Sequence, residues 1–424
     1  MAELNFNPGD YVRLRLALRE EEGTVIESPE SDIILLKLKS GYNIGIPKEN
    51  ILASRVLKKF EEEKKDYDIK QKKELPAIGL IITGGTIASK ANQSTGGVSP
   101  IADVDEFLSF YPELLNTVRI KKLEIPFKVW SENMSSEHWI KMAEVAKEML
   151  EDSEIKGIVI SHGTDTLHYT SAALSFFLRN LNKPVVLTYS QRSIDRASSD
   201  ASLNLQCAAK MALSDCAEVM LVGHASTNDD YCYALRGTKV RKLHSSRRDA
   251  FKPVNCEPIA KVYPDKVEFI SEYRKAGKEK VEVDTSFTDK VALIKFYPGQ
   301  SPDILDYYAL KYKGVVIEVA GIGQVATGSG TAHNWVPTLK KHIKNGMVVC
   351  CAAQTIFGRV DPYVYSSARE MLDAGCIFLE DMMAETAFVK LGWVLGHYGW
   401  KKDVKEKMLE NFAGEFNERL GGEM

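Results

Sequence analysis

Two short stretches of the sequence place a threonine hydroxyl just after an apolar run. The run Ile78–Ile82 stops at Thr83–Thr86, and the run Gly157–Ser161 stops at His162–Thr166, and each stop contains glycine. Short apolar runs that end at glycines are typical of buried parallel strands leading into a tight turn, because glycine permits positive φ and a close backbone approach to a ligand. Open α/β sheets bind their substrates beyond the carboxyl ends of such strands, so a hydroxyl held there can meet a substrate.

Each turn also has a simpler interpretation. Threonine and aspartate are favoured N-caps, so Thr86, Thr164 or Asp165 could merely cap the next helix. That alternative is strong for one turn and weaker for two, because the carboxyl ends of parallel strands meet at one edge of a sheet. The pair of turns therefore predicts two hydroxyls and a carboxylate along the same edge.

The elements that would position these residues alternate between strand and helix. Further apolar runs follow at Val185–Tyr189, Glu218–Val222, Val291–Phe296, Gly314–Glu318 and Met347–Cys351. Such alternation predicts an α/β protein with a parallel sheet covered on both faces. The apolar period is lost over 273–289, which indicates a boundary before a smaller α/β unit.

The first part of the chain has a different pattern. Short strands are predicted at Tyr11–Leu16, Gly23–Glu27, Asp32–Leu38 and Gly41–Ile46. Their spacing predicts a small β-barrel similar to SH3-like modules. Residues 57–75 then hold 13 charged side chains among 19 residues, which favours a solvated linker or an exposed helix. We therefore expect domains at 1–75, 76–280 and 281–424.

Composition sets broad limits on the function. With 424 residues and 44% hydrophobic content the chain can form two or three cored domains, and a net charge of −3 carries little information about partners. No apolar run is long enough to cross a membrane, and Met1–Asp10 is too polar for a signal peptide. Seven cysteines without a CxxC pair indicate a reducing compartment, so we expect a cytoplasmic protein. The sequence shows no metal-ligand cluster and no P-loop.

The order TGGTIAS, residues 83–89, then SHGTDT, residues 161–166, resembles the L-asparaginase/glutaminase family, whose members hydrolyse amides with threonine nucleophiles. The resemblance covers about residues 76–424 and implies the two-domain α/β fold of that family. It also implies that Thr86 attacks a side-chain amide while Thr164, Asp165 and Lys242 handle the proton. Lys242 fits the family spacing better than Lys239.

Amide hydrolysis also needs hydrogen-bond donors for the developing oxyanion and a grip on the substrate. Backbone N–H groups at Gly85 and Gly163 are the expected donors. The resemblance places Ser131 and Glu132 at the α-carboxylate and α-ammonium of the substrate, although an exposed loop is the alternative for this pair. Which threonine forms the acyl intermediate stays open.

One feature departs from the asparaginase pattern. The family usually has a tyrosine in a lid after the first motif, whereas residues 91–100 read ANQSTGGVSP. With the added barrel and the stretches 191–200 and 354–360, the chain resembles the D-type subunit family of archaeal-type glutamyl-tRNA(Gln) amidotransferases. That resemblance implies ammonia release from glutamine or asparagine for an E-type partner subunit, which binds glutamyl-tRNA(Gln) and ATP with Mg. It also implies no cofactor on this chain and a homodimer within a heterotetramer.

Two alternatives remain, a free-standing cytoplasmic type I L-asparaginase and a non-catalytic binding protein on the same scaffold. One charge feature bears on the choice. Residues 236–252 hold seven basic side chains and one acid. Such runs are usually solvated faces, but Lys242 lies within this one, which predicts a basic surface near the site mouth for an acidic partner or a tRNA.

Overall fold

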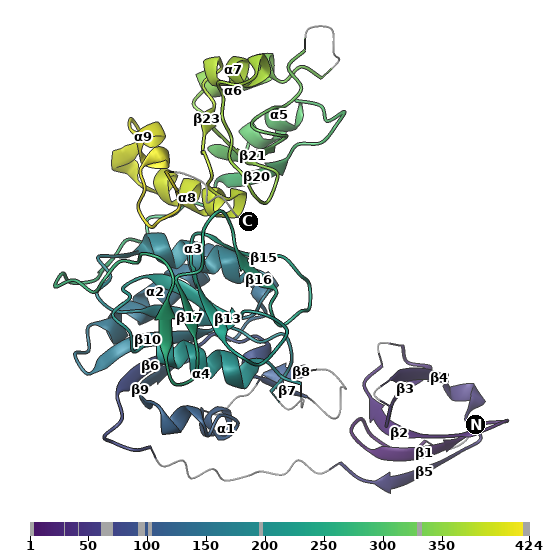
Figure 1. The fold of residues 1–424 in the computed structure, drawn as a ribbon. Helices are drawn as coiled ribbons and strands as arrows, with labels where there is room; N and C mark the ends of the chain where they lie inside the picture. The colour runs from purple at the N-terminus through teal and green to yellow at the C-terminus, as the bar shows by residue number, and fades with distance from the viewer. Residues whose placement is uncertain are drawn as a thin grey trace.

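The structure is a computed structural model that describes residues 4–28, 30–40, 42–60, 71–91, 98–100, 104–194, 198–328 and 333–418. Three larger sheets organise these residues (Figure 1). A five-stranded sheet lies in the N-terminal part, an eight-stranded sheet in the middle, and a four-stranded sheet in the C-terminal part.

The N-terminal sheet is antiparallel throughout, in the order β4-β3-β2-β1-β5. Its strands are β1 (Tyr11–Arg15), β2 (Glu20–Ile26), β3 (Ile33–Leu38), β4 (Asn43–Pro47) and β5 (Ala53–Lys58). Val12 and Leu14 alternate inward along β1 and pack with Val25, Leu36 and Ile46 in a hydrophobic core of their own. The predicted small, barrel-like β domain is confirmed, while residues 61–70 of the predicted charged linker lie outside the described residues.

The central sheet has the order β18-β17-β14-β13-β12-β10-β6-β9. Its strands are β6 (Ala77–Ile82), β9 (Arg119–Glu124), β10 (Ile155–Ser161), β12 (Val185–Thr188), β13 (Val219–His224), β14 (Cys232–Arg236), β17 (Ala260–Val262) and β18 (Val267–Phe269). The strands from β9 to β13 are parallel, as predicted. Strands β14, β17 and β18 each run antiparallel to the preceding strand of the sheet, which makes the sheet mixed.

Helices cover both faces of the central sheet. They are α1 (Val104–Ser109), α2 (Ser136–Leu150), α3 (Leu167–Phe177) and α4 (Ala201–Met211). The apolar side chains of α2 and α3 belong to one core, and those of α1 and α4 to a second core on the opposite face. The parallel strands are therefore buried on both sides, which explains their continuous apolar sequence.

The C-terminal sheet, β20-β21-β22-β23, is parallel throughout. Its strands are β20 (Val291–Lys295), β21 (Gly314–Val319), β22 (Val348–Ala353) and β23 (Ile377–Phe378). The helices of this domain are α5 (Ile304–Ala309), α6 (Val336–Lys344), α7 (Ser366–Asp373), α8 (Ala384–Gly396) and α9 (Val404–Leu409). Helices α5 to α7 pack on one face, and α8 packs on the other.

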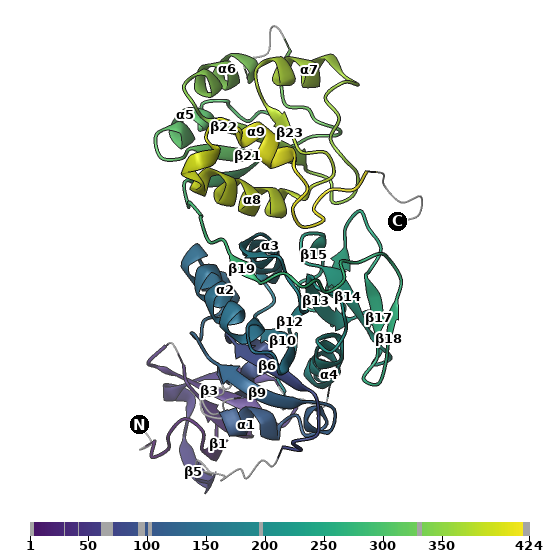
Figure 2. The same ribbon diagram turned by 90° about the vertical axis from the view of Figure 1, so that its left-hand side faces the viewer.

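The two α/β domains share a hydrophobic core. Helix α8 lies over α3 between the two sheets (Figure 2), and the rings of Phe176 and Trp393 stack with centroids 5.5 Å apart. The predicted boundary near 280 falls in a connection that pairs back to the central domain, because β19 (Glu282–Val283) pairs with β11 (Leu178–Arg179). The exact domain boundaries stay predictions.

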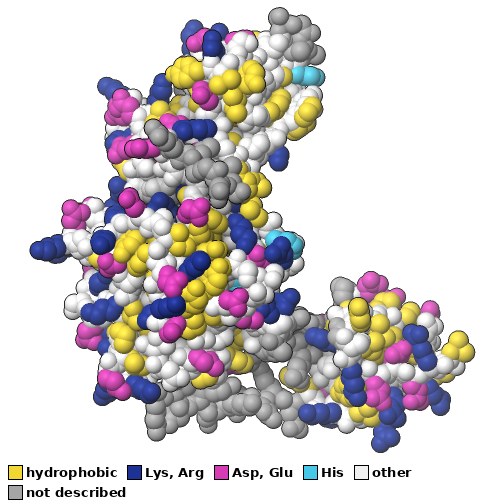
Figure 3. Space-filling model, viewed as in Figure 1, with side chains coloured by type: hydrophobic (Ala, Val, Ile, Leu, Met, Phe, Trp, Pro, Cys, Tyr) yellow, Lys and Arg dark blue, Asp and Glu magenta, His cyan; other side chains and the backbone are white. Residues whose placement is uncertain are grey.

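Two further observations concern the molecule's surface and its thiols. Acidic and basic side chains are interspersed over the face seen in Figure 3 rather than gathered into one field. All seven cysteines are free thiols and six are buried, in line with their expected role as small core residues. Within the described residues, no helix combines the length and apolar character that a membrane crossing requires.

Candidate active site

The two glycine turns lie against each other at the carboxyl edge of the central sheet. Strands β6 and β10 are neighbours with Ile82 opposite Ser161, so both chains leave the sheet at the same level. Gly85 has a φ of 80°, and a Cβ there would lie 2.5 Å from the Gly163 nitrogen. Only glycine fits such a backbone contact. Thr86 and Thr164 each follow one of the two touching glycines.

Thr86 opens the 3-10 helix η2 (Thr86–Ala88) and is half-buried. The next residue, Ile87, is fully buried in the core, and its carbonyl accepts a hydrogen bond from the Tyr111 hydroxyl at 2.8 Å. The Thr83 hydroxyl in turn donates to the Ser161 carbonyl at 2.8 Å. The first turn is thereby fixed on both sides of Thr86.

Three of the predicted catalytic residues form one hydrogen-bonded cluster. The Lys242 ammonium donates to the Thr164 hydroxyl oxygen at 2.7 Å and to Asp165 Oδ1 at 2.8 Å. Lys242 is only 10% exposed, whereas the Asp165 carboxylate is 63% exposed. A positive charge beside a hydroxyl stabilises the alkoxide, so the cluster can move a proton to or from Thr164.

The two residues predicted to bind the substrate, Ser131 and Glu132, lie in different surroundings. Ser131 opens the 3-10 helix η4 (Ser131–Asn133) and is buried, and its hydroxyl oxygen accepts from the Asp165 backbone N–H at 3.1 Å. The Thr166 hydroxyl donates to the Ser131 carbonyl at 2.6 Å, which ties η4 to the second turn. Glu132 is exposed, so its role at the substrate ammonium stays a prediction.

Sequence reasoning did not single out His162. Its ring is fully buried, and its Nδ1–H donates to the Gly163 carbonyl at 2.6 Å. Thr170 donates to Nε2 at 2.9 Å and accepts from the Trp139 indole at 3.0 Å, so both ring nitrogens have partners. Burial lowers the pKa of His162 to about 4 and keeps the ring neutral. The signal available in the sequence was a histidine directly before the glycine of the turn.

His162 also sets the direction of the next peptide group. In a planar trans peptide the C=O and the following N–H point in opposite directions. With the Gly163 carbonyl held by His162, the Thr164 N–H points away from the buried ring. This orientation suits the predicted use of backbone N–H groups near Gly163 as oxyanion donors.

The basic run at 236–252 is not one surface. All seven cations have acidic partners: Arg236 with Glu218, Lys239 with Asp381, Arg241 with Glu385, Lys242 with Asp165, Arg247 and Lys252 with Asp249, and Arg248 with Asp229. Five of the six acidic partners lie outside the run and leave no trace in its local sequence, so the prediction of a basic surface near the site mouth is wrong.

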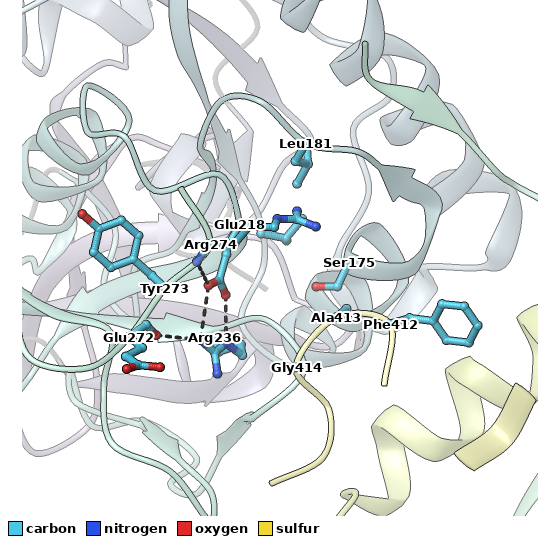
Figure 4. A pocket seen from close by; sticks show the side chains of 11 residues that line it. Ser175, Leu181, Glu218, Arg236, Glu272, Tyr273, Arg274, Phe412, Ala413 and Gly414 are labelled. Carbon is cyan, nitrogen blue, oxygen red and sulfur yellow. Dashed lines mark hydrogen bonds and ion pairs between the residues drawn. The ribbon is translucent and has the colours of Figure 1, made fainter. Parts of the chain in front are cut away.

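Arg236 shows this most clearly. It lines a cavity of about 370 Å³ together with Glu218, Arg274 and Phe412 (Figure 4). In β14 it lies opposite Met220, near the amino ends of the parallel strands, whereas the threonine turns lie at their carboxyl ends.

Parts of the remaining expectations fall outside the described residues. Strands β7 (Ser89–Ala91) and β8 (Val98–Pro100) pair as a hairpin at the predicted lid, but residues 92–97 are not described. The same holds for Asp195 and Arg196 in the stretch 191–200. Within the described residues, no three His, Cys, Asp or Glu side chains are grouped as metal ligands.

Comparison with known proteins covers nearly the whole chain. The family models GatD N-terminal domain, Asparaginase N-terminal, and Glutaminase/Asparaginase C-terminal domain match residues 6–57, 77–275 and 290–408. The D-type subunit of glutamyl-tRNA(Gln) amidotransferase from Pyrococcus abyssi is 45% identical over 98% of this chain and 96% of its own length. The Pyrococcus furiosus protein of that name is 46% identical over 96% of this chain and 94% of its own.

Solved structures support the fold. The thermostable L-asparaginase from Thermococcus kodakarensis has a TM-score of 0.72 at 30% identity, covering 80% of this chain and 99% of that one. L-asparaginase I from Vibrio cholerae has a TM-score of 0.68 at 26% identity, covering 81% and 99%. The asparaginase-like part is thus complete, and the N-terminal sheet precedes it. The chain belongs to the family of D-type subunits of glutamyl-tRNA(Gln) amidotransferase.

Proposed function

We propose that this chain is the glutaminase subunit of a glutamyl-tRNA(Gln) amidotransferase, in which it releases ammonia from glutamine for a partner subunit. The observation that carries the proposal is the cluster of Lys242, Thr164 and Asp165 beside the Gly85–Gly163 contact. It places a cation and a carboxylate next to a threonine hydroxyl at the ligand-binding edge of the sheet.

The reaction proceeds in two steps. The Thr86 oxygen bonds to the side-chain carbonyl carbon of glutamine, and backbone N–H groups at the two turns stabilise the oxyanion. The hydroxyl proton passes through the group of Thr164, Lys242 and Asp165 to the amide nitrogen, the C–N bond breaks, and ammonia leaves. Water then attacks the acyl-threonine ester, which releases glutamate and restores the hydroxyl.

The relatives are named as one subunit of an amidotransferase, which supports a complex with a further subunit. We propose that an E-type partner subunit binds glutamyl-tRNA(Gln) together with ATP and Mg, and that the present chain needs no cofactor of its own. Glutamine or asparagine serves as amide donor, and two copies of the chain form a homodimer within a heterotetramer. The support is the 45–46% identity to the D-type subunits over nearly the full length of the chain, together with the N-terminal domain that they share.

Reconstitution tests the proposal. Glutamine hydrolysis by the purified chain is measured alone, with the partner subunit, and with partner and glutamyl-tRNA(Gln). We expect slow hydrolysis alone and about hundredfold stimulation in the full mixture, which corresponds to about 2.7 kcal/mol of coupling. Full-rate hydrolysis of asparagine by the lone chain, unchanged by partner and tRNA, would favour a free-standing L-asparaginase instead.

A salt series adds a second readout. If tRNA phosphate contacts contribute to the stimulation of glutamine hydrolysis, the stimulation should weaken as the salt concentration rises. Arg247 is 53% exposed despite its pair with Asp249, whereas Arg248 is 15% exposed and bonded to Asp229 and the Ser198 carbonyl. We therefore expect Arg247→Gln to reduce the stimulation about two- to fivefold and leave basal hydrolysis unchanged. Equal stimulation in this variant would exclude Arg247 from the tRNA or partner contact.

A further inference from the structure

The strand that carries Lys242 has two faces with different tasks. Side chains alternate along the β15 strand (Val240–Lys242) and the residue before it. On one face Val240 is fully buried in the core of the central domain, and Lys242 reaches the Thr164 hydroxyl. Lys239 and Arg241 lie on the other face.

Both side chains of that second face are bound by the C-terminal domain. The Lys239 ammonium donates to Asp381 Oδ2 at 2.5 Å, and neither side chain is exposed. Arg241 pairs at 2.8 Å with Glu385, which lies in the first turn of α8 and is 6% exposed. Buried charge pairs tolerate little displacement, because a charge left unpaired in the interior is costly.

Further hydrogen bonds strengthen the same junction. The Thr386 hydroxyl donates to the Thr238 carbonyl at 2.9 Å, and the Thr238 hydroxyl donates to the Ala413 carbonyl at 3.0 Å. Asn417 donates to both carboxylate oxygens of Asp381, at 3.0 Å and 2.8 Å. Asp381 is therefore itself fixed and serves as an anchor.

The partner strand of the hairpin ends at the same junction. Strand β16 (Phe251–Pro253) pairs with β15, and two residues later Asn255 adopts a positive φ of 59°. The Asn255 side chain donates to the carbonyls of Gly358 and Asp381, at 2.9 Å and 3.2 Å. Both strands of the Lys242 hairpin are thus attached to the C-terminal domain.

We infer that the C-terminal domain positions the Lys242 ammonium against Thr164, and that Lys239 and Asp381 are positioning residues that act through the β15 backbone. Because neighbouring side chains on a strand move together with that backbone, a shift of the Lys239–Asp381 anchor displaces Lys242. The inference rests on the proposed function of Lys242. Misplacement of a reacting group by about 1 Å can reduce turnover about a hundredfold.

The test uses a double variant that removes both charges at similar volume, Lys239→Met with Asp381→Asn. The Asn amide oxygen can still accept from Asn417 and no unpaired charge stays buried, so the variant should fold. In the complete complex we expect kcat for glutamine to fall about ten- to a hundredfold with KM changed less than about twofold. Competitive chemical labelling of lysines, read by mass spectrometry, should show faster labelling of Lys242, which is released from Thr164 and Asp165.

The chain offers a matched control in a second fully buried pair. Lys390 and Glu415 lie 2.7 Å apart with no exposure, both within the C-terminal domain, and Glu415 also accepts from the Phe412 and Ala413 backbone N–H groups. Lys390→Met with Glu415→Gln removes both charges, while the Gln amide oxygen can still accept from the Ala413 N–H. This variant should leave kcat and Lys242 labelling at wild-type values in the folded protein. A loss of kcat equal to that of the test variant would mean that any damage to the C-terminal domain suffices.

A milder variant covers the case in which the test variant does not fold. Thr386→Val keeps the volume and removes one donor to Thr238, and we expect kcat about two- to fivefold lower. A folded test variant, or Thr386→Val, with wild-type kcat and wild-type Lys242 labelling overturns the inference. Failure of the proposed function would give a different result from failure of this inference. In that case the wild-type chain would not hydrolyse glutamine. The labelling comparison would still report the position of Lys242.

Discussion

Lys239 and Lys242 are three residues apart and of one type, and their surroundings assign them different tasks. Lys239 is fully buried, and burial lowers its pKa against the opposing effect of the nearby Asp381 carboxylate. Lys242 keeps 10% exposure, and its ammonium donates to a hydroxyl and to the exposed Asp165 carboxylate. A lysine enclosed with its counter-ion is structural, whereas a partly exposed lysine that is bonded to a hydroxyl can exchange a proton with it.

The first prediction is that Thr86 and the cluster of Thr164, Asp165 and Lys242 act as one unit. Thr86→Val, Thr164→Val and Lys242→Met should each lower kcat/KM for glutamine by about a thousandfold or more, and a double variant should be little worse than the worst single one. Ammonia release by the reconstituted complex measures the effect. Thr117→Val, which follows the 3-10 helix η3 (Leu114–Asn116) outside the site, serves as the matched control. Independent, multiplying losses would show that the residues do not act together.

The second prediction concerns stability and pH. Burial lowers the pKa of His162 from 6.5 to about 4, so between these values the unfolded chain binds a proton that the folded chain excludes. Stability is therefore lost as pH falls through this window and is nearly constant above pH 7. His162 should account for about 2 kcal/mol of the fall in unfolding free energy between pH 7 and pH 5.

Urea unfolding at several pH values measures this dependence. His162→Asn, whose amide nitrogen can take the place of Nδ1, should flatten the pH dependence by that amount, while Thr117→Val, which removes no titratable group, serves as the control. His168 adds a similar contribution, because burial lowers its pKa to about 3. A pH dependence that is the same in the wild type and in His162→Asn would contradict the assignment.

At the scale of elements, the site depends on two turns that share a backbone contact. A Cβ at Gly163 would lie 2.8 Å from the Ser131 Cβ, so the second turn is also packed against η4. Three segments that are far apart in sequence thus meet at glycines. This packing fixes the backbone from which the Thr86 and Thr164 side chains extend.

The third prediction tests that packing. Gly85→Ala should lower activity about a hundredfold or more and lower the melting temperature by several degrees, because the new Cβ meets the Gly163 backbone at a φ that L residues avoid. The matched control is Gly399→Ala, where a Cβ meets no atom within 4 Å. It should be neutral or slightly stabilising. Wild-type kinetics in Gly85→Ala would show that the contact is not needed.

Much of this element-level architecture is predictable from the sequence. The strands β6 and β10, their glycine turns and four of the five N-terminal strands follow from local apolar patterns and glycine positions, whereas β5 was not predicted. The three antiparallel strands β14, β17 and β18 were not predicted, since they are short and their order depends on partners elsewhere. The pairings of the basic run escaped for a similar reason, because Asp381 lies 142 residues beyond Lys239 and leaves no periodic signal.

At the scale of the whole molecule, the N-terminal sheet has a core separate from the rest, whereas the two α/β domains have a core in common. The N-terminal sheet has its own core and closes at Phe60, whose backbone N–H donates to Asp10 at 2.8 Å. The two α/β domains instead share the core formed by α3 and α8. The α/β body already includes Gln71, whose side-chain oxygen accepts from the Ile120 N–H at 2.7 Å.

The fourth prediction follows from these boundaries. Deleting Met1–Lys70 should leave a folded chain with basal glutamine hydrolysis within about twofold of wild type, since no residue of the cluster is removed. Thermal unfolding and ammonia release check this outcome. Deleting Met1–Lys73 as a comparison removes the Gln71 acceptor and should cost about 1 kcal/mol more in stability. An unfolded product of the shorter deletion would show that the N-terminal sheet belongs to the common core.

Lys239 and Asp381 are 142 residues apart in the sequence, and this separation has a consequence for synthesis. A ribosome adds about 5–20 residues per second, so Thr86, Thr164 and Lys242 have all been made about 7–30 s before the anchor that fixes the lysine is complete. During this interval the nascent chain carries both glycine turns but no fixed Lys242. From the proposed anchoring of Lys242 we therefore expect unfinished chains to hydrolyse glutamine at least about tenfold more slowly than the complete chain.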